Sequence, residues 1–271
     1  MDSSILGNEA PIRLGVFLGL LGLMALAETV RPRRARGEPR LRRWVPNLAL
    51  VAIDTLALRV AFFFLPALAV GFAHVVTVEG IGLLPMLGVA GAPALVAGLL
   101  LFDLAVWAQH VASHKVPLLW RLHRVHHADL DVDVTTALRF HPVEIVLSMA
   151  WKLAFIAALG LPSLAVLLGE LVLNGGAMFN HANLRLPGWL DRLLRLVIIT
   201  PDVHRVHHSV RPEETDSNYG FGLTWWDRIF GTWRAQPADG HETMQLGLAP
   251  FRDGPGQGLG WMLALPFRSS R

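Results

Sequence analysis

Residues 94–127 read ALVAGLLLFDLAVWAQHVASHKVPLLWRLHRVHH. The first nine of them, 94–102, end an apolar run without a charged side chain, as expected of a helix that crosses a lipid bilayer. The rest contains two histidine motifs, HxxxH at 110–114 and HxxHH at 123–127. An apolar helix that leads into two histidine motifs predicts a membrane protein with a metal site at the end of its helices.

The spacing of these histidines places them on shared helix faces. Side chains three and four residues apart lie on the same side of a helix, so His110 and His114 stack one turn apart. His123 likewise lies beneath both His126 and His127. Because these last two are about 100° apart round the helix, they can lean toward two different ions.

A second HxxHH motif at 204–208 and two prolines extend this pattern. Pro117 lies between the first two motifs and is expected to interrupt the helix, so that the motifs turn toward each other. Thr200 and Pro201 resemble a helix start, which puts the second HxxHH motif in the opening turns of a new helix. Imidazole binds iron, zinc, copper and nickel, so the motifs predict a two-metal centre without selecting the metal.

Twelve histidines and no cysteine among 271 residues restrict the chemistry. The lack of thiols excludes disulfides, thiolate zinc sites and cysteine-ligated iron–sulfur clusters. The chain is 53% hydrophobic and 17% charged, with a mean hydropathy of +0.44, which is typical of a membrane protein. Seven arginines lie in one block between Arg31 and Arg43, so the net charge of +3 calls for no nucleic-acid partner.

Four or five apolar spans or half-spans are expected, in an all-α integral-membrane helical bundle. The candidates are 14–27, 60–78, 81–102 and 145–179, the last interrupted at 160–162 and therefore read as a helical hairpin. The second span has an alternative start at Ala49, and the first has an alternative role as a signal peptide, although its positive charges follow the apolar run. We expect Lys152, Glu170 and Asn174 to point at protein or at a polar cavity, because they are costly in contact with lipid.

The arginine block also predicts the orientation of the chain. Positively charged loops stay in the cytoplasm, so the chain returns to the cytoplasm after the third span, near residue 109. All three histidine motifs then lie on the cytoplasmic side. We therefore predict a cytoplasmic, histidine-rich helical cap on a bundle in a bacterial inner membrane.

The order and spacing of the motifs resemble the fatty acid hydroxylase and sterol desaturase superfamily, which are integral-membrane, non-haem di-iron oxygenases. The resemblance extends over residues 95–240 and includes RFHPVE (139–144), NHANL (180–184) and WDRIFGT (226–232). The first 90 residues carry no comparable signature. We therefore expect N-terminal membrane helices with the arginine-rich loop (1–90), a catalytic domain (91–240) and a C-terminal tail (241–271).

The resemblance implies two iron ions that activate dioxygen and are held by histidines. The ligands that it indicates by position are His110, His114, His123, His126, His127, His181, His204, His207 and His208. In related hydroxylases a further histidine lies one helical turn before the one that matches His181, but this chain has Ala177 there. This departure either leaves an open coordination position or allows His141 to act as the further ligand. If His141 is not a ligand, we expect it to begin a helix or to orient other ligands.

Polar residues near the motifs are candidates for orienting the ligands, because a metal-bound imidazole usually donates its other N–H to a carboxylate or carbonyl. Asp103 is the strongest candidate, since it lies seven residues, nearly two turns, before His110. Asn180 is a weaker one. The aromatic segment 219–233 is expected to line the substrate opening or to belong to an aromatic belt at the membrane surface.

The resemblance implies an enzyme that hydroxylates, or desaturates, an unactivated C–H bond of a lipid such as an acyl chain, a sterol or a sphingolipid. The electrons would come from a separate ferredoxin or cytochrome, and Arg121 and Arg124 are candidates for docking it, if they are not merely solvated. Two alternatives stay open: a zinc-dependent membrane lipid amide hydrolase, and a non-enzymatic metal transporter or sensor. Nine histidines exceed the three ligands of a hydrolase, and a transporter would carry ionisable residues along several spans.

Overall fold

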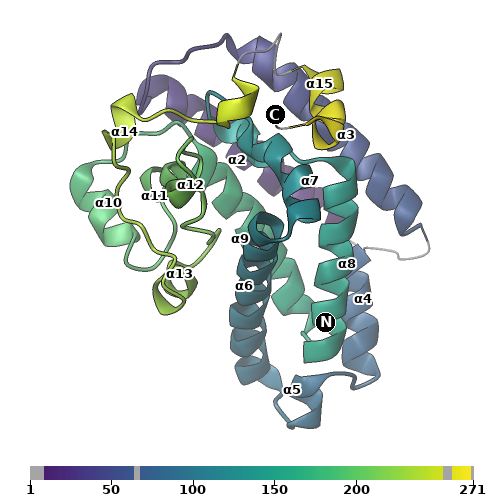
Figure 1. Ribbon diagram of the computed structural model, residues 1–271. Coiled ribbons are helices and arrows are strands. Elements are labelled where there is room, and N and C mark those ends of the chain that lie inside the picture. Colours follow the sequence, from purple (N-terminus) through teal and green to yellow (C-terminus); the bar gives the residue numbers. More distant parts are fainter. Residues whose placement is uncertain (1–8, 64–67, 253–257, 270–271) are drawn as a thin grey trace.

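Helices and loops make up the computed structural model, which describes residues 9–63, 68–252 and 258–269 (Figure 1). Within these residues six helices are long and apolar enough to cross a membrane, counting α4 (Leu68–Val78) and α5 (Leu83–Met86) together. The other five are α2 (Glu9–Val30), α3 (Arg40–Ala61), α6 (Gly91–Lys115), α8 (Pro142–Leu159) and α9 (Ser163–His181). The shorter elements are α7 (Pro117–His127), η1 (Val134–Leu138), α10 (Gly188–Leu194), α11 (Pro201–His207), α12 (Pro212–Thr215), α13 (Trp225–Ile229), α14 (Gly240–Thr243), η2 (Ala249–Phe251), α15 (Leu259–Ala264) and η3 (Leu265–Phe267).

The all-α membrane bundle predicted from the sequence is confirmed, with one more candidate span than expected. The additional helix is α3, which the sequence indicated only as an alternative start of the second span at Ala49, because Asp54 and Arg59 interrupt its apolar character. The predicted span at 60–78 is wrong in its boundaries. It is divided between the end of α3 at Ala61 and the start of α4, and residues 64–67 lie outside the described part of the chain.

The predicted span at 81–102 is also placed wrongly. Its first part contains only the short helix α5, and the long helix α6 begins at Gly91 and continues to Lys115. Gly82 and Gly91 have positive φ values of 103° and 63°, a conformation that glycine adopts without steric cost. The turns at these glycines interrupt the apolar segment. The long membrane helix therefore begins only at Gly91 and extends to the first histidine motif.

The hairpin predicted over 145–179 is confirmed as α8 and α9. Gly160 joins the two helices in the left-handed conformation, with φ at 69°. A Cβ at this position would lie 2.4 Å from Cδ of Pro85 and 2.6 Å from the carbonyl oxygen of Ile81. The turn therefore needs glycine both for its backbone conformation and for its contact with the α5 region.

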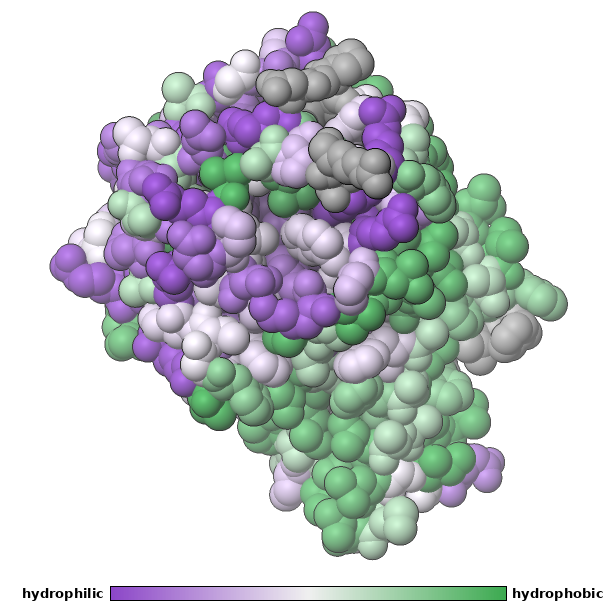
Figure 2. Space-filling model, viewed as in Figure 1, coloured by the Kyte–Doolittle hydropathy of each residue, from purple (hydrophilic) through white to green (hydrophobic). Residues whose placement is uncertain are grey.

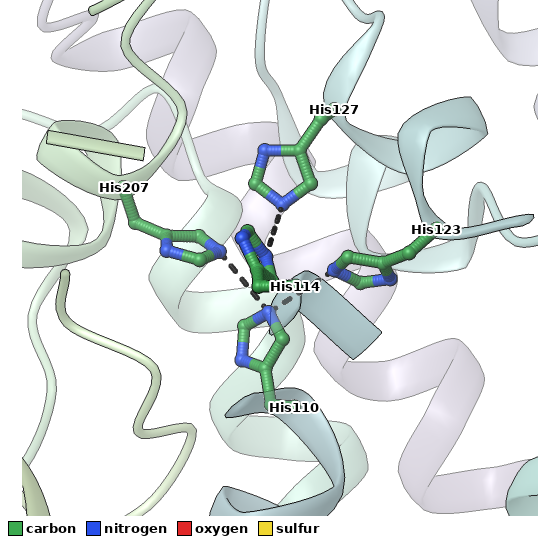
Figure 3. A group of neighbouring side chains, drawn as sticks. All are labelled: His110, His114, His123, His127 and His207. Atoms are coloured by element: carbon green, nitrogen blue, oxygen red, sulfur yellow. Dashed lines mark hydrogen bonds between the residues drawn. The ribbon is translucent and has the colours of Figure 1, made fainter. Parts of the chain in front are cut away.

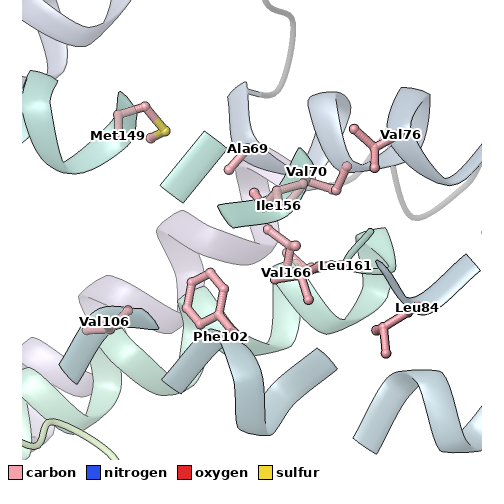
Figure 4. Close-up of a cluster of buried hydrophobic side chains, with 12 residues drawn as sticks. Ala69, Val70, Val76, Leu84, Phe102, Val106, Met149, Ile156, Leu161 and Val166 are labelled. Atoms are coloured by element: carbon pink, nitrogen blue, oxygen red, sulfur yellow. The ribbon is translucent and has the colours of Figure 1, made fainter. Parts of the chain in front are cut away.

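The largest apolar core lies where α4, α6, α8 and α9 pack together (Figure 4). Val70, Ile156 and Val166 are completely buried there. Phe102 of α6 packs against Gly169 of α9, where a Cβ would approach the phenyl ring to 2.7 Å. This close contact fixes α6 against α9, and the same two helices carry histidines at their far ends.

Polar residues gather over the part of the molecule that contains α10 to α14, whereas the long helices present an apolar surface below it (Figure 2). The arginine-rich segment packs onto this polar cap. Arg43 is buried and donates to Asp129 (2.6 Å) and Asp133 (2.5 Å). Burial raises the pKa of Asp129, but the Arg43 guanidinium outweighs it and holds that pKa well below its ordinary value. The segment thus braces the end of the bundle that carries the histidines.

Candidate metal centre

Nine histidine side chains converge in two adjacent groups. In each group, one nitrogen of every ring lies within 4.8 Å of the corresponding nitrogens of the others. The five-histidine group consists of His110, His114, His123, His127 and His207 (Figure 3). The four-histidine group consists of His126, His181, His204 and His208. The structure therefore brings together all nine histidines that the sequence marked as candidate ligands.

Proline residues arrange the helices that present these histidines. Pro117 begins α7 directly after α6 ends at Lys115, so the chain turns between the first two motifs as predicted. Pro201 begins α11, also as predicted. The Thr200 hydroxyl does not cap this helix, however, and instead donates to Asp191 at 2.6 Å.

Backbone carbonyls fix the tautomer of three histidines. In each, the Nδ1–H group donates to a carbonyl: His110 to Tyr219 (2.6 Å), His207 to Ser217 (2.7 Å) and His181 to Ala177 (2.7 Å). Because a carbonyl oxygen only accepts, Nδ1 carries the proton and Nε2 presents a lone pair in all three rings.

Glu144 fixes a fourth ring in the same way. Its Oε1 lies 2.6 Å from Nδ1 of His123, and both side chains are buried. A carboxylate partner holds the ring orientation and makes Nε2 a stronger donor to a metal. Glu144 was not among the residues predicted from the sequence to orient a ligand; its signal is an acidic side chain in the first turn of a mostly apolar helix.

The lone pairs of the five-histidine group point at one another. Nε2 of His110 lies 3.1 Å from Nε2 of His123 and 3.0 Å from Nε2 of His207. No hydrogen lies between these atoms, so their approach is repulsive unless a cation lies among them. Two nitrogens bound to one ion at right angles, each at about 2.1 Å, are about 3.0 Å apart. The residues present therefore fit a metal ion.

The four-histidine group has the same spacing but fewer anchors. Nε2 of His181 lies 3.0 Å from that of His204 and 3.1 Å from those of His126 and His208. The Nδ1 atoms of these last three rings are buried without a hydrogen-bond partner in the described part of the chain. With only His181 anchored, this group is held less firmly than the five-histidine group.

The donor set is neutral and consists entirely of nitrogen. Burial lowers the pKa of His126, His127, His204 and His208 well below their ordinary value, and that of His207 to about 3. These rings are therefore uncharged at neutral pH, which is the form that binds metal.

An inner cavity of about 160 Å³ opens beside the histidines. His110 and His123 line it, together with Phe140, Ala177 and Phe221. The Phe140 ring stacks on His126 at a centroid distance of 4.6 Å, and Phe221 stacks on His110 at 4.8 Å. A substrate group in the inner cavity would thus meet the apolar side chains of Phe140, Ala177 and Phe221 beside the candidate ligands, and polar side chains elsewhere in the wall.

Asp103 and Asn180 hold a loop rather than a histidine. Asp103 accepts a hydrogen bond from the indole N–H of Trp226 (2.7 Å), and the Asn180 amide donates to the carbonyl of Phe221 (2.7 Å). The loop between α12 and α13 carries the carbonyls that hold His110 and His207. Both predicted residues therefore act on the ligands through this loop, and the expectation of a direct contact for Asp103 is wrong.

Asp227 is a further organiser of this loop that the sequence analysis missed. It is fully buried and accepts hydrogen bonds from the backbone N–H groups of Tyr219 and Gly220 (both 2.9 Å) and from Trp107 (3.0 Å). Its position within the segment 226–232 was noted only as part of a pattern. A lone carboxylate among aromatic residues is the signal that could have identified it.

His141 lies outside both groups. It precedes α8, and its Nδ1 accepts the backbone N–H of Val143 (3.2 Å). Of the roles that the sequence left open, the structure therefore supports a helix start. Ala177 lines the inner cavity, so no ligand takes the position that precedes His181 by one turn.

Sequence comparison relates this arrangement to characterised proteins. The sequence model of the fatty acid hydroxylase family matches residues 95–232, which include both histidine groups. The ornithine lipid hydroxylase OlsE of Rhizobium tropici is 31% identical over 143 residues, covering 52% of this chain and 42% of that protein. The alkylglycerol monooxygenase of Homo sapiens is 30% identical over 141 residues, covering 49% of this chain and 29% of that protein. The cholesterol 25-hydroxylase of Rattus norvegicus is 30% identical over 141 residues, covering 51% of this chain and 46% of that protein.

The chain thus spans less than half the length of each of these relatives. No solved structure is significantly similar to it. The family match nevertheless covers about half of the chain and contains every histidine of the two groups. On this evidence, the chain belongs to the fatty acid hydroxylase family.

Proposed function

We propose that the chain is a membrane-bound, oxygen-dependent enzyme that hydroxylates an unactivated C–H bond of a lipid. The observation that carries this function is the pair of adjacent all-nitrogen groups, with five and four imidazoles, beside a cavity lined by both apolar and polar side chains. The relatives support a lipid substrate, since they are named as hydroxylases or monooxygenases of ornithine lipid, alkylglycerol and cholesterol.

The metals in this proposal are two iron ions, one in each histidine group. When bound, they supply the reduction of dioxygen by two electrons and two protons, with one oxygen atom inserted into the C–H bond and the other released as water. Glu144 and the carbonyls of Tyr219 and Ser217 keep the rings of the five-histidine group aimed at a single point. These fixed orientations reduce the reorganisation needed during a reaction.

The inner cavity holds the reacting C–H bond in this proposal. Phe140 and Phe221 cover two of the histidines and exclude water from their faces. Ala177 lines the inner cavity and its carbonyl accepts a hydrogen bond from His181, and we propose that the cavity approaches the four-histidine group there. The exact placement of the substrate decides between hydroxylation and desaturation at such a site.

A separate protein delivers the electrons, and its docking face is proposed to lie near Trp120. This ring contacts His114 and His127 at centroid distances of 4.9 and 5.4 Å and also reaches a surface groove with Arg121 and Arg124. Arg121 is exposed; its Nε donates to the carbonyl of Pro266 (2.8 Å), and its other N–H groups suit an acidic electron carrier such as a ferredoxin or cytochrome. Arg124 is buried and donates to the carbonyls of Leu265 and Arg268, so it holds the C-terminal segment instead.

The location of the site is also a proposal. The six apolar helices indicate an integral membrane protein. We infer from the arginine block that the histidines face the cytoplasm, and we place the chain in a bacterial inner membrane. The division into 1–90, 91–240 and 241–271 stays part of the proposal, and the family match at 95–232 falls inside its catalytic segment.

The competing functions have less support. A zinc amide hydrolase needs three protein ligands and one water, whereas each group here offers four or five nitrogens. A metal transporter would spread ligands along a path through the membrane, whereas these histidines gather near the ends of α6 and α9.

Lipid mass spectrometry of expressing cells tests the proposed function. Cells with the wild type, His207→Ala or the control His74→Ala, whose histidine lies on α4 away from both groups, receive a matched electron donor. We expect a lipid with one added oxygen in the wild type and the control but not in His207→Ala, together with iron in the purified wild type. Loss of two hydrogens would indicate desaturation. Identical lipids in all three strains, with no iron in the wild type, would refute an oxygenase.

A further inference from the structure

Four charged side chains form a cluster between the long helices. Glu170 of α9 accepts hydrogen bonds from Lys152 of α8 (2.6 Å) and Arg13 of α2 (2.5 Å), and Arg13 also donates to Glu9 (2.6 Å). We call these four residues the ion cluster. The expectation that Lys152 and Glu170 point at protein or a polar cavity is confirmed.

The position of the ion cluster is unusual for a purely structural contact. Charged side chains in the hydrocarbon region are rare, and those that occur face cavities and mark functional paths. Apolar residues of similar volume would hold α2 against α8 and α9 without desolvating four charges. The cluster is also not sealed, since 14% of the Lys152 side chain and 26% of the Arg13 side chain are exposed.

An outer cavity of about 550 Å³ contains the ion cluster and adjoins the inner cavity beside the metal centre. It lies between α2, α3, α4, α8 and α9, and its walls contain the whole ion cluster. It shares Ile145, Ser148, Lys152 and Asn174 with the inner cavity. The inner cavity alone is smaller than an ordinary ligand site of about 300–1,000 Å³. A bound lipid must therefore extend from the inner cavity into the outer one.

The outer cavity has more hydrogen-bond donors to spare than acceptors, although Oε2 of Glu9 has no partner in the described part of the chain. The charged residues of the outer cavity are Arg13, Arg59, Lys152, Glu9 and Glu170, three cations against two carboxylates. Both oxygens of Glu170 already accept hydrogen bonds from the cluster. The Lys152 ammonium has three donors, of which one goes to Glu170, and the exposed amide of Asn174 adds two more.

We propose that the ion cluster binds the head group of the lipid substrate, and that this head group is an anionic oxygen group, a carboxylate or a phosphate. The head group accepts charge-assisted hydrogen bonds from Lys152 and hydrogen bonds from Asn174, while Arg13 keeps Glu170 paired. This inference rests on the proposed lipid hydroxylase function and adds a head-group chemistry to it.

The position of Lys152 also determines which carbon is presented to the metals. Lys152 follows Glu144, the partner of His123, by eight residues on α8, which is about 12 Å along the helix axis. A head group at Lys152 therefore leaves about 12 Å of chain before the histidines. Lys152 is a positioning residue in this proposal, because it acts on the reacting carbon only through the rest of the lipid.

Binding of lipids with one chain and different head groups tests the proposal. The probes are tritiated hexadecanoate, hexadecyl phosphate and hexadecanol, bound to the purified full-length protein without oxygen or electrons. We expect the wild type to bind at least one anionic probe about tenfold more tightly than hexadecanol. Lys152→Met is expected to lose this preference, and Lys152→Arg to keep it. The control Arg185→Met removes an exposed cation on the polar cap and is expected to bind like the wild type.

The arms of the experiment also identify the head group. A preference for hexadecanoate alone indicates a carboxylate, a preference for hexadecyl phosphate alone indicates a phosphate, and both together indicate the shared chemistry. Equal binding of all three probes by the wild type would overturn the proposal, as would a preference that survives in Lys152→Met. If Lys152→Met does not fold, Asn174→Leu leaves every ion pair intact and must weaken the same preference.

Failure of this inference can be told apart from failure of the proposed function. Head-group selectivity is measured without turnover, whereas the hydroxylase function depends on iron content and an oxygenated product. A protein that contains iron and oxygenates lipid but binds the three probes equally would refute only the head-group site. A protein with the head-group preference but no iron and no product would refute only the hydroxylase.

Discussion

Replacing Glu144 by alanine is expected to weaken metal binding in the five-histidine group while the four-histidine group stays loaded. Glu144 contacts His123, which belongs only to the five-histidine group. Without the carboxylate, the His123 ring loses the partner that fixes its Nδ1–H tautomer and its orientation. Nε2 of His123 then no longer points reliably at the Nε2 of His110, 3.1 Å away.

The size of the effect follows from the contact. A hydrogen bond to a charged group contributes about 1.5–3 kcal/mol, and this one is short at 2.6 Å and buried. Since 1.4 kcal/mol corresponds to a factor of about ten, metal affinity in this group should fall about 10–100-fold, which is also the range for loss of an orienting partner. Glu144→Gln should lie in between, because its amide oxygen still accepts the hydrogen bond without the charge.

Chelator competition measures this loss directly. Loaded protein is dialysed against increasing chelator concentrations, and the iron retained per chain is counted. We expect Glu144→Ala to fall from two ions to one at a concentration that leaves the wild type loaded. Glu79→Ala, which removes an exposed carboxylate after α4, should behave like the wild type. Simultaneous loss of both ions, or unchanged retention in Glu144→Ala, would refute the assignment of Glu144 to one metal.

Four further changes test other parts of the structure. Arg43→Met removes the cation that contacts both Asp129 and Asp133, and should lower the free energy of unfolding by about 3–5 kcal/mol in thermal denaturation. Gly160→Ala forces a side chain into a left-handed turn against α5 and should cost more than about 2 kcal/mol in the same assay. Trp120→Leu should slow reduction by the electron donor in stopped-flow measurements with the iron content unchanged. Burial lowers the pKa of His241 to about 4, so the unfolded chain takes up a proton between about pH 6.5 and 4 that the folded chain does not. The free energy of unfolding should therefore fall on acidification by up to about 1.4 kcal/mol per pH unit in this range. It should fall less steeply in His241→Gln.

The candidate ligands were predictable because their spacing is local. An HxxxH or HxxHH motif fixes which side chains share a helix face, whatever the rest of the chain does. Pro117 and Pro201 are equally local signals: Pro117 interrupts the helix between the first two motifs and Pro201 begins α11, as the sequence predicted. The grouping into five and four was not predictable, because it depends on how α6, α7, α9 and α11 pack against one another.

The partners that hold the ligands were harder to predict, because most of them are backbone groups. The carbonyls of Tyr219 and Ser217 have no signature in the sequence, and Asp227 matters only because it shapes the loop that carries them. Span boundaries failed for a related reason. Glycines with positive φ, such as Gly80 after α4 and Gly82 before α5, interrupt an apolar stretch that hydropathy alone reads as continuous.

The contact between Lys152 and Glu170 was only partly predictable from the sequence. Their charge in an apolar segment was enough to predict that each needs a polar neighbour, since the alternative is a charge in lipid. It did not predict which neighbour, because Arg13 lies 157 residues from Glu170 in the chain and reaches it only when α2 packs on α9. The same packing opens the outer cavity onto the pair. A charge that is improbable in its segment thus predicts a contact from the sequence, and the fold determines whether that contact is a structural tie or, as we propose, a binding site.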